Sequence, residues 1–331
     1  MRFLIIRLSS IGDIVLTTPV IRCLHKQLPG VEIHFLVKKN FASILNSNPY
    51  VNKVHIWKDE ISDTIEDLKA ENFDVVIDLH HNLRSLKIKS GLGLKSFSFY
   101  KLNVEKWLMT ALKWNRLPDR HIVDRYLDTV SSFGVKNDGA GLDFFIPMED
   151  EVIPADISDT LNREYVAMVI GAAHYTKRLP AEKLSELLQK IPFPVVLIGG
   201  PEDRALGEML VKGRENQVVN SCGHLNLNQS ASLVRQASLV ITHDTGMMHI
   251  AAAFHRPIIS VWGNTIPAFG MSAYYGEIGG VDFRAEVQGL SCRPCSKIGY
   301  SKCPRKHFRC MIDQDIHGIA IKVREVLQQP T

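Results

Sequence analysis

Short, almost uninterrupted apolar segments alternate with amphipathic stretches along the chain, and the pattern occurs twice. The apolar segments cover residues 2–8, 32–37, 53–57 and 73–79 in the first half, and 165–170, 194–198, 217–220, 239–242 and 258–262 in the second. Strands that are buried on both faces show such continuous apolar runs, whereas half-exposed strands alternate. The pattern therefore predicts βαβ units and parallel sheets.

Helices are expected between and after these strands. The stretches with helical character are residues 61–71, 122–133, 181–190, 203–211, 229–236, 246–254 and 316–327. Pro19 also marks a helix, which either begins near Thr18 with the proline in its first turn or is kinked at that point.

Residues 146–156 hold two prolines and four acidic residues, a composition typical of a linker. A length of 331 residues also suggests about two domains. We therefore expect an N-terminal domain at 1–155 and a C-terminal domain at 156–331, both doubly wound α/β folds. Such folds bind ligands beyond the carboxyl ends of their strands, so a cleft between the domains is the expected site. The pattern leaves open whether the terminal helix packs back on the first domain.

The composition is that of an ordinary globular protein, with 45% hydrophobic and 22% charged residues. No apolar stretch is long enough to span a membrane, and the apolar run at the N-terminus is too short for a signal peptide. A cytoplasmic location is therefore expected. Six cysteines in a chain of this length are not a secreted disulfide pattern.

The first candidate motif, Ser9-Ser10-Ile11-Gly12-Asp13, directly follows the first predicted strand. A glycine there lets the backbone approach a ligand closely, and an acid facing a cleft is a candidate general base. The alternative is that Asp13 only caps a helix.

The second candidate motif, Asp244-Thr245-Gly246, lies between a predicted strand and a predicted helix, with His249 one turn later. Free amides at a helix N-terminus bind phosphate, and the acid suits a sugar hydroxyl. The alternative is an ordinary capped helix whose histidine is partly buried.

Two further loops follow strands of the second half. Thr176 and Lys177 offer a hydroxyl and a cation suited to phosphate, unless the loop is only a solvated basic segment. Glu202 follows two glycines and suits ribose hydroxyls, or caps the next helix. The chain has no G-x-G-x-x-G after its first strand, no P-loop and no G-x-S-x-G, which disfavours nicotinamide enzymes, P-loop NTPases and α/β-hydrolases.

Together these segments resemble glycosyltransferase family 9, the ADP-heptose:lipopolysaccharide heptosyltransferases, over nearly the whole chain. The resemblance rests on the motif at 9–13 with Thr17-Thr18-Pro19, on residues 73–79 and 176–180, and most specifically on residues 244–253 with Pro257 and 262–265.

The resemblance implies a GT-B fold whose N-terminal domain binds the acceptor and whose C-terminal domain binds the nucleotide-sugar. It implies an inverting transfer with no catalytic metal, in which ADP-heptose is the donor and a lipopolysaccharide inner-core saccharide is the acceptor. Asp13 would be the general base, and Lys177 would neutralise the departing diphosphate. The expected donor-binding residues are Gly12, Thr176, Lys177, Glu202, Asp244, Thr245, Gly246 and His249.

We expect Ser10, His81 and Arg84 to contact the acceptor. The segment that holds the last two, residues 80–84, departs from the Gln-Gly that is more usual in the family. The family also often has Trp at Leu179 and Pro at Asn264.

Four cysteines cluster near the C-terminus at Cys292, Cys295, Cys303 and Cys310, with His307 among them. Their spacing is compatible with a structural zinc site, although the second pair is not C-x-x-C. Reduced structural thiols, or disulfides formed after purification, are the alternatives.

Residues 84–125 carry ten Lys and Arg against three Asp and Glu, interleaved with five aromatic residues. Cations with aromatics suit an anionic lipid surface, so peripheral binding to the cytoplasmic face of the inner membrane is expected. The same composition also suits nucleic acid, or a solvated surface.

Two other functions compete with the transferase. One is a nucleotide-sugar epimerase or hydrolase of the same fold, which would consume donor without an acceptor. The other is a zinc-containing nucleic-acid-binding protein, which would leave Asp13 and the motif at 244–249 unexplained. We expect no nucleic-acid partner.

Overall fold

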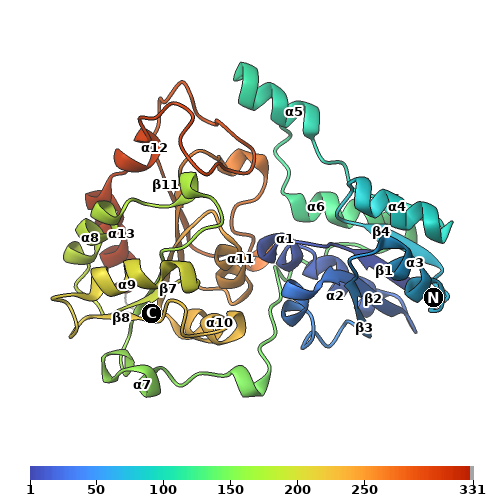
Figure 1. Ribbon diagram of the computed structural model, residues 1–331, viewed down its shortest axis with the longest axis horizontal. Coiled ribbons are helices and arrows are strands. Elements are labelled where there is room, and N and C mark those ends of the chain that lie inside the picture. The colour runs from blue at the N-terminus through green and yellow to red at the C-terminus, as the bar shows by residue number, and fades with distance from the viewer. Residues whose placement is uncertain (329–331) are drawn as a thin grey trace. The chain divides into compact units, whose positions relative to one another are not determined.

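The computed structural model describes residues 1–328 and divides the chain into two compact units (Figure 1). Unit 1 comprises Met1–Leu102, Arg120–Phe145 and Gly276–Ile278. Unit 2 comprises Asn103–Asp119, Ile146–Tyr275 and residues 279–328. Residues 103–119 therefore group with the second unit, although the sequence pattern placed them in the first domain.

Unit 1 is built on a five-stranded sheet, and every pair of neighbouring strands is parallel. Its order is β3-β2-β1-β4-β5, with strands β1 (Arg2–Ile6), β2 (Glu32–Lys38), β3 (Lys53–Trp57), β4 (Val75–Asp78) and β5 (Ser96–Ser98). Its α-helices are α1 (Ile11–Val15), α2 (Thr18–Gln27), α3 (Ile61–Lys69), α4 (Leu83–Leu92) and α6 (Ile122–Leu127).

The core of unit 1 follows from the alternation of side chains along β1. Leu4 and Ile6 point to the face where Leu36, Leu68 and Ile88 complete a buried cluster with α3 and α4. The neighbouring residues of β1 are also fully buried, which explains the uninterrupted apolar sequence.

Unit 2 is built on a six-stranded parallel sheet of order β11-β10-β9-β6-β7-β8. Its strands are β6 (Val166–Val169), β7 (Val195–Ile198), β8 (Val218–Asn220), β9 (Leu239–His243), β10 (Ile258–Trp262) and β11 (Asp282–Glu286). Its α-helices are α5 (Asn103–Trp107), α7 (Pro154–Ile157), α8 (Ala181–Lys190), α9 (Arg204–Val211), α10 (Leu227–Gln236), α11 (Gly246–Ala253), α12 (Arg309–Ile312) and α13 (Ile316–Gln328).

The terminal helix α13 belongs to the core of unit 2. It lies beside α8 (Figure 1), and Ile316, Ile319 and Val323 join the buried cluster that α8 forms with β6 and β7.

Nine predicted strands are present, with bounds that differ by a few residues at most, and α2 begins at Thr18 with Pro19 in its first turn. The elements that escaped prediction include α4, α5 and the edge strands β5 and β11. In α4 only Ser85 and Ile88 are buried, so its sequence shows no broad apolar face. Among residues 1–328, no helix has the length and apolar character that crossing a membrane requires.

Candidate functional site

In unit 1, an ion pair joins the buried Arg7, just after β1, to Asp13 in α1, whose side chain is 20% exposed. The distance from Arg7 Nη2 to Asp13 Oδ1 is 2.7 Å. The other carboxylate oxygen accepts hydrogen bonds from the Ser10 hydroxyl at 2.8 Å and the Ser10 amide at 3.3 Å. Ser10 and Asp13 thus form the capping box of α1, so the cap that was the alternative reading of Asp13 is present.

Besides capping the helix, the Asp13 carboxylate can accept a further hydrogen bond. Burial alone would raise the pKa of Asp13, but Arg7 and the hydrogen bonds from Ser10 outweigh burial and lower it. The group is therefore an anion at neutral pH. Each carboxylate oxygen has two lone pairs. The two donors of Ser10 occupy both on one oxygen, whereas the oxygen paired with Arg7 keeps one for a further donor. The arrangement can accept a proton from a hydroxyl that reaches it.

Arg7 is held firmly by groups other than Asp13. Its guanidinium donates to the Leu79 carbonyl at 2.6 Å, the Tyr126 hydroxyl at 3.1 Å and the Ser9 carbonyl at 2.8 Å. Sequence reasoning missed this residue; its only signal was a charge directly after an otherwise apolar strand.

Asp78, at the end of β4, organises the segment that was expected to meet the acceptor. Its side chain is fully buried and accepts from the amides of His80 and His81, at 3.0 and 2.7 Å. It also accepts from Ser85 and pairs with Lys89, at 2.8 and 2.9 Å. This acid has a structural role in fixing the turn between β4 and α4.

The predicted acceptor residues have different surroundings in the structure. Ser10 is engaged with Asp13, as described. His81 is exposed, and its Nδ1 lies 2.8 Å from the Phe99 carbonyl, while Arg84 is exposed on the first turn of α4. His80, the residue before His81, interacts with the charges of Arg7 and Asp13. Its buried Nδ1 has no hydrogen-bond partner within residues 1–328. Burial, with Arg7 nearby, lowers the pKa of His80 to about 4.

In unit 2, a second ion pair lies at the carboxyl edge of the sheet. Lys177 Nζ is 2.6 Å from Asp244 Oδ2 and 3.1 Å from the Asp244 carbonyl oxygen. Thr265, which follows β10, donates to the same Oδ2 at 2.8 Å. Three loops that follow neighbouring parallel strands β6, β9 and β10 therefore converge here, as the strand pattern predicts.

Helix α11 begins beside this pair. Thr245 is its N-cap and Gly246 its first residue, so the amides at the start of its first turn follow Asp244 directly. His249 is buried one turn further along. A cation and a helix N-terminus at one place form a site suited to a diphosphate.

Thr176 and Glu202 have different surroundings from this pair. Thr176 is buried, and its hydroxyl exchanges hydrogen bonds with the Tyr300 backbone at 2.8 and 3.2 Å, which anchors the lysine loop. Glu202 is exposed after β7, beside the buried pair of Asp203 with Arg178 at 2.9 Å. Its exposure leaves Glu202 accessible to a ligand.

Comparison with known proteins identifies the family of this chain. The model of glycosyltransferase family 9 (heptosyltransferase) matches residues 61–280. The chain belongs to this family. It is therefore a glycosyltransferase.

Similar proteins cover almost all of this family 9 chain. Lipopolysaccharide heptosyltransferase 1 of Escherichia coli K12 is 26% identical over 303 residues, which cover 84% of this chain and 92% of that protein. A family 9 glycosyltransferase from Veillonella parvula has a TM-score of 0.78 at 21% identity, covering 99% and 98% of the two chains. The E. coli heptosyltransferase WaaC with ADP has a TM-score of 0.71 at 21% identity, covering 98% and 100%. These structures confirm the GT-B fold.

One further residue of this glycosyltransferase site was missed. Asn264 lies between β10 and Thr265, is 2% exposed, and neither side-chain polar atom has a hydrogen-bond partner within residues 1–328. A buried amide left unsatisfied costs about 1–3 kcal/mol, so such a group commonly marks a place where a ligand or water binds.

The cysteine segment of this family 9 enzyme does not reproduce a compact metal site within residues 1–328. All four cysteines are free, Cys292 Sγ lies 3.7 Å from His307 Nε2, and Cys295 Sγ donates to the Cys292 carbonyl at 3.0 Å. Burial raises the pKa of Cys295 to about 11 and that of Cys310 to about 12. Thiols held protonated in this way suit packing better than nucleophilic catalysis. The structural zinc site stays a prediction.

The segment 103–119 packs against the cysteine segment within unit 2. Lys113 Nζ donates to the carbonyls of Cys292 and Pro294, at 3.1 and 2.7 Å. A cavity of about 380 Å³ lies between the two segments, bordered by Trp107 and by His174 of the lysine loop. Several large apolar side chains of the segment are exposed: Val104, Trp107, Leu112 and Trp114.

Proposed function

We propose that this chain is an inverting heptosyltransferase that uses ADP-heptose as donor. The observation that carries the proposal is the pair of Lys177 with Asp244 at the start of α11, where a cation and helix amides meet. The relatives support the same donor class, because E. coli WaaC has been solved with ADP and with ADP-2-deoxy-2-fluoro heptose.

In the proposed reaction, an acceptor hydroxyl attacks the anomeric carbon of the donor sugar. Its proton passes to the Asp13 carboxylate, a carbon–oxygen bond forms on the face opposite the diphosphate, and the bond to the diphosphate oxygen breaks. ADP leaves with the electron pair. Asp13 suits this step because it is ionised and one of its oxygens retains a free lone pair.

The departing diphosphate gains charge as the bond breaks. Lys177 and the first-turn amides of α11 would stabilise that charge without a divalent ion. Asp244 would exchange its contact with Lys177 for the donor sugar, and Glu202 would meet the ribose. Thr245, Gly246 and His249 would surround the phosphates, and Gly12 would allow the donor to approach the Asp13 turn. Thr176 would act by holding the lysine loop.

For the acceptor, we propose an anionic, lipid-linked saccharide of the lipopolysaccharide inner core. The relatives are named lipopolysaccharide heptosyltransferases, and Ser10 lies beside the proposed base. The exposed apolar side chains at 104–114 lie among cations, a composition suited to an anionic membrane surface. We therefore propose peripheral binding at the cytoplasmic face of the inner membrane, with His81 and Arg84 exposed for the acceptor.

A donor screen by thermal shift tests the donor assignment. ADP-heptose should raise the melting temperature more than UDP- or GDP-sugars, because a ligand that binds only the folded state stabilises it. A shift with UDP- or GDP-sugars alone would contradict the assignment. Consumption of donor in the absence of any acceptor would instead indicate a hydrolase or epimerase.

The absence of a metal requirement has its own test. Transfer should proceed at an unchanged rate after dialysis against EDTA, since Lys177 and α11 replace the ion in the proposal. An activity that disappears and returns only with Mg²⁺ or Mn²⁺ would contradict it.

A further inference from the structure

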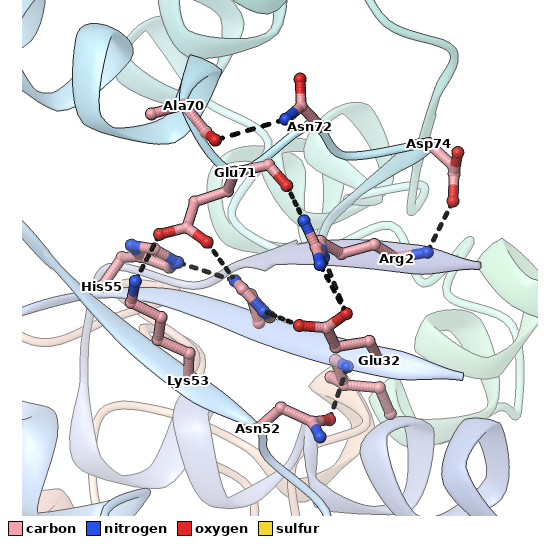
Figure 2. A network of polar contacts seen from close by, with 11 residues as sticks. Arg2, Glu32, Asn52, Lys53, His55, Ala70, Glu71, Asn72 and Asp74 are labelled. Carbon is pink, nitrogen blue, oxygen red and sulfur yellow. Dashed lines mark hydrogen bonds and ion pairs between the residues drawn. The ribbon is translucent and has the colours of Figure 1, made fainter. Parts of the chain in front are cut away.

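Three metal-ligating side chains meet in unit 1 at the edge of the sheet opposite the Asp13 site. His34 lies near the start of β2, His55 lies on β3, and Glu71 follows α3. One ligand atom from each lies within 4.8 Å of the other two. Figure 2 shows the Glu71 carboxylate directed toward His55 and toward the starts of these strands.

We propose that this cluster binds one divalent transition-metal ion of the zinc type. Imidazole nitrogens and a carboxylate oxygen are the ligands that Zn²⁺ prefers in proteins when no thiolate is present. The site would join two strands and the end of a helix, so its role would be to stabilise the first sheet. It takes no part in the proposed transfer.

The distances fit a shared ion after small movements. His34 Nδ1 is 2.9 Å from His55 Nε2 and 3.8 Å from Glu71 Oε2. Two ligands bound to one tetrahedral zinc at about 2.0–2.1 Å lie roughly 3.4 Å apart. The first separation must therefore widen and the second narrow by about half an ångström. The ligand atoms of His55 and Glu71, which lie within 4.8 Å of each other, must also settle about 3.4 Å apart, the spacing that tetrahedral zinc sets.

A contact between Glu32 and the other ring nitrogen of His34 orients the imidazole so that Nδ1 faces the cluster. Its Nε2 lies 3.0 Å from Glu32 Oε1, and the other oxygen of that carboxylate accepts from Arg2 Nε at 2.8 Å. An ionised carboxylate only accepts hydrogen bonds, so Nε2 carries the hydrogen and Nδ1 of the neutral ring keeps its lone pair. Metal-bound histidines in proteins are commonly oriented by such a carboxylate.

His55 supplies the second nitrogen. In the metal-free cluster its Nε2–H donates to His34 Nδ1, since that atom is an acceptor. When metal binds, this hydrogen moves to Nδ1 of the same ring, so Nε2 becomes a ligand and the imidazole stays neutral. No proton leaves the protein in this step.

Glu71 is anchored while one of its oxygens remains accessible. Oε1 pairs with Lys53 and Oε2 faces His34, while the Glu71 carbonyl accepts from Arg2 (Figure 2). The Lys53 side chain is 54% exposed, so solvent screens its repulsion of a bound cation.

Burial around the histidines should strengthen the binding of an ion by the cluster. His34 is 2% exposed, and both rings pack edge-on against Phe73, with ring centroids 5.1 and 6.0 Å away. Glu71 lies at the more exposed rim, which leaves a route for the ion. An apolar surround strengthens the attraction between an ion and its ligands.

Equilibrium dialysis of the full chain against ZnCl₂, followed by metal analysis, tests the proposal. At a zinc concentration that fills the wild-type site, the wild-type protein should hold one more zinc per chain than His55→Gln. The affinity of the variant for that additional ion should be lower on the order of 10–100-fold. The amide introduced by this substitution can still donate to His34, so the variant should fold. Zinc held by the cysteine segment does not depend on His55, and the difference therefore reports this cluster alone. His25→Gln, an exposed histidine of the same unit, is the matched control.

A second variant protects the test against a folding defect in the first. Glu71→Gln should also lose the additional zinc, whereas Asp67→Asn, which breaks an exposed ion pair of α3, should keep it. Zinc should raise the melting temperature of the wild-type protein and of both controls, but by less in His55→Gln and Glu71→Gln. Equal zinc content and equal affinity in wild type, His55→Gln and Glu71→Gln would overturn the proposal.

Discussion

In each unit an ion pair of the candidate site lies just beyond a central strand, but the two pairs have different surroundings. Arg7 and Asp13 in unit 1 are 2.7 Å apart, and Arg7 makes three further hydrogen bonds to fixed groups. Lys177 and Asp244 in unit 2 are 2.6 Å apart, and the ammonium contacts both the carboxylate and the carbonyl of Asp244. We therefore propose that the first pair holds its carboxylate in place, while the second opens when a ligand binds.

This difference assigns different tasks to the two acids. A carboxylate held by a rigid cation keeps one orientation and one charge state, as a base that must meet a hydroxyl requires. A lysine that is balanced by a neighbouring acid can turn to an incoming phosphate, since its ammonium is a compact charge on a flexible stem. The following predictions test this contrast.

Asp13→Asn should give the largest effect. Asn keeps the size of the side chain but cannot take a proton, so transfer should fall by about 10²–10⁴-fold while the ADP-heptose thermal shift is retained. Steady-state kinetics and thermal shift on the same preparation measure both. Asp59→Asn, an exposed acid of unit 1, is the control, and near-wild-type transfer by Asp13→Asn would remove Asp13 from its role.

Lys177→Ala should affect donor binding as well as rate. Loss of the ammonium of this pair removes charge stabilisation from bound donor and from the departing diphosphate, so transfer should fall by about 10²–10³-fold and the ADP thermal shift should shrink. Lys183→Ala, on the neighbouring helix α8, should leave both unchanged. If Lys177→Ala also left both unchanged, the pair would not be part of the donor site.

Arg7→Gln should change the pH dependence more than the rate at neutral pH. Arg7 lowers the pKa of Asp13, so its removal raises that pKa and moves the acid limb of kcat/KM to higher pH. The ionised pair contributes stability above the unfolded pKa of Asp, about 3.9, and loses it as the pH falls through the lower folded pKa. The variant should therefore lose part of this stability. An acid limb identical to that of the wild type would show that Asp13 does not titrate in the reaction.

Thr265→Val should have the smallest effect. It removes one hydrogen bond to Asp244, worth about 1 kcal/mol, so KM for the donor should rise by about fivefold with kcat little changed. Donor titrations check this, with Thr160→Val as a control in unit 2. A fall in kcat equal to that of Lys177→Ala would mean that Asp244 is fixed as rigidly as Asp13, and the contrast between the two pairs would fail.

Much of the fold could be predicted from the sequence because it depends on the local pattern of apolar residues. The apolar runs that became β1, β6 and β9 are buried on both faces, so each residue reports its own environment. Helix α4 and strand β11 were missed because they lie at edges, where one face meets solvent and the pattern weakens.

Part of the candidate site could also be predicted from the sequence, for a related reason. Asp13, Lys177 and Asp244 stand directly after strands, and the carboxyl ends of parallel strands share one edge. Partners that are distant in sequence gave no such signal. Asn264 is polar in the sequence, but only its burial without a partner within residues 1–328 makes it notable.

By itself, the sequence determined the two parallel sheets, the four strand-end loops and the family, because these depend on residue type and spacing along the chain. The tertiary structure decided what each charge meets. It tied Arg7 to Asp13 and Tyr126, grouped 103–119 with unit 2, and brought His34, His55 and Glu71 together from three elements. Pairing of this kind depends on the register of strands and the packing of helices, and no local pattern encodes it.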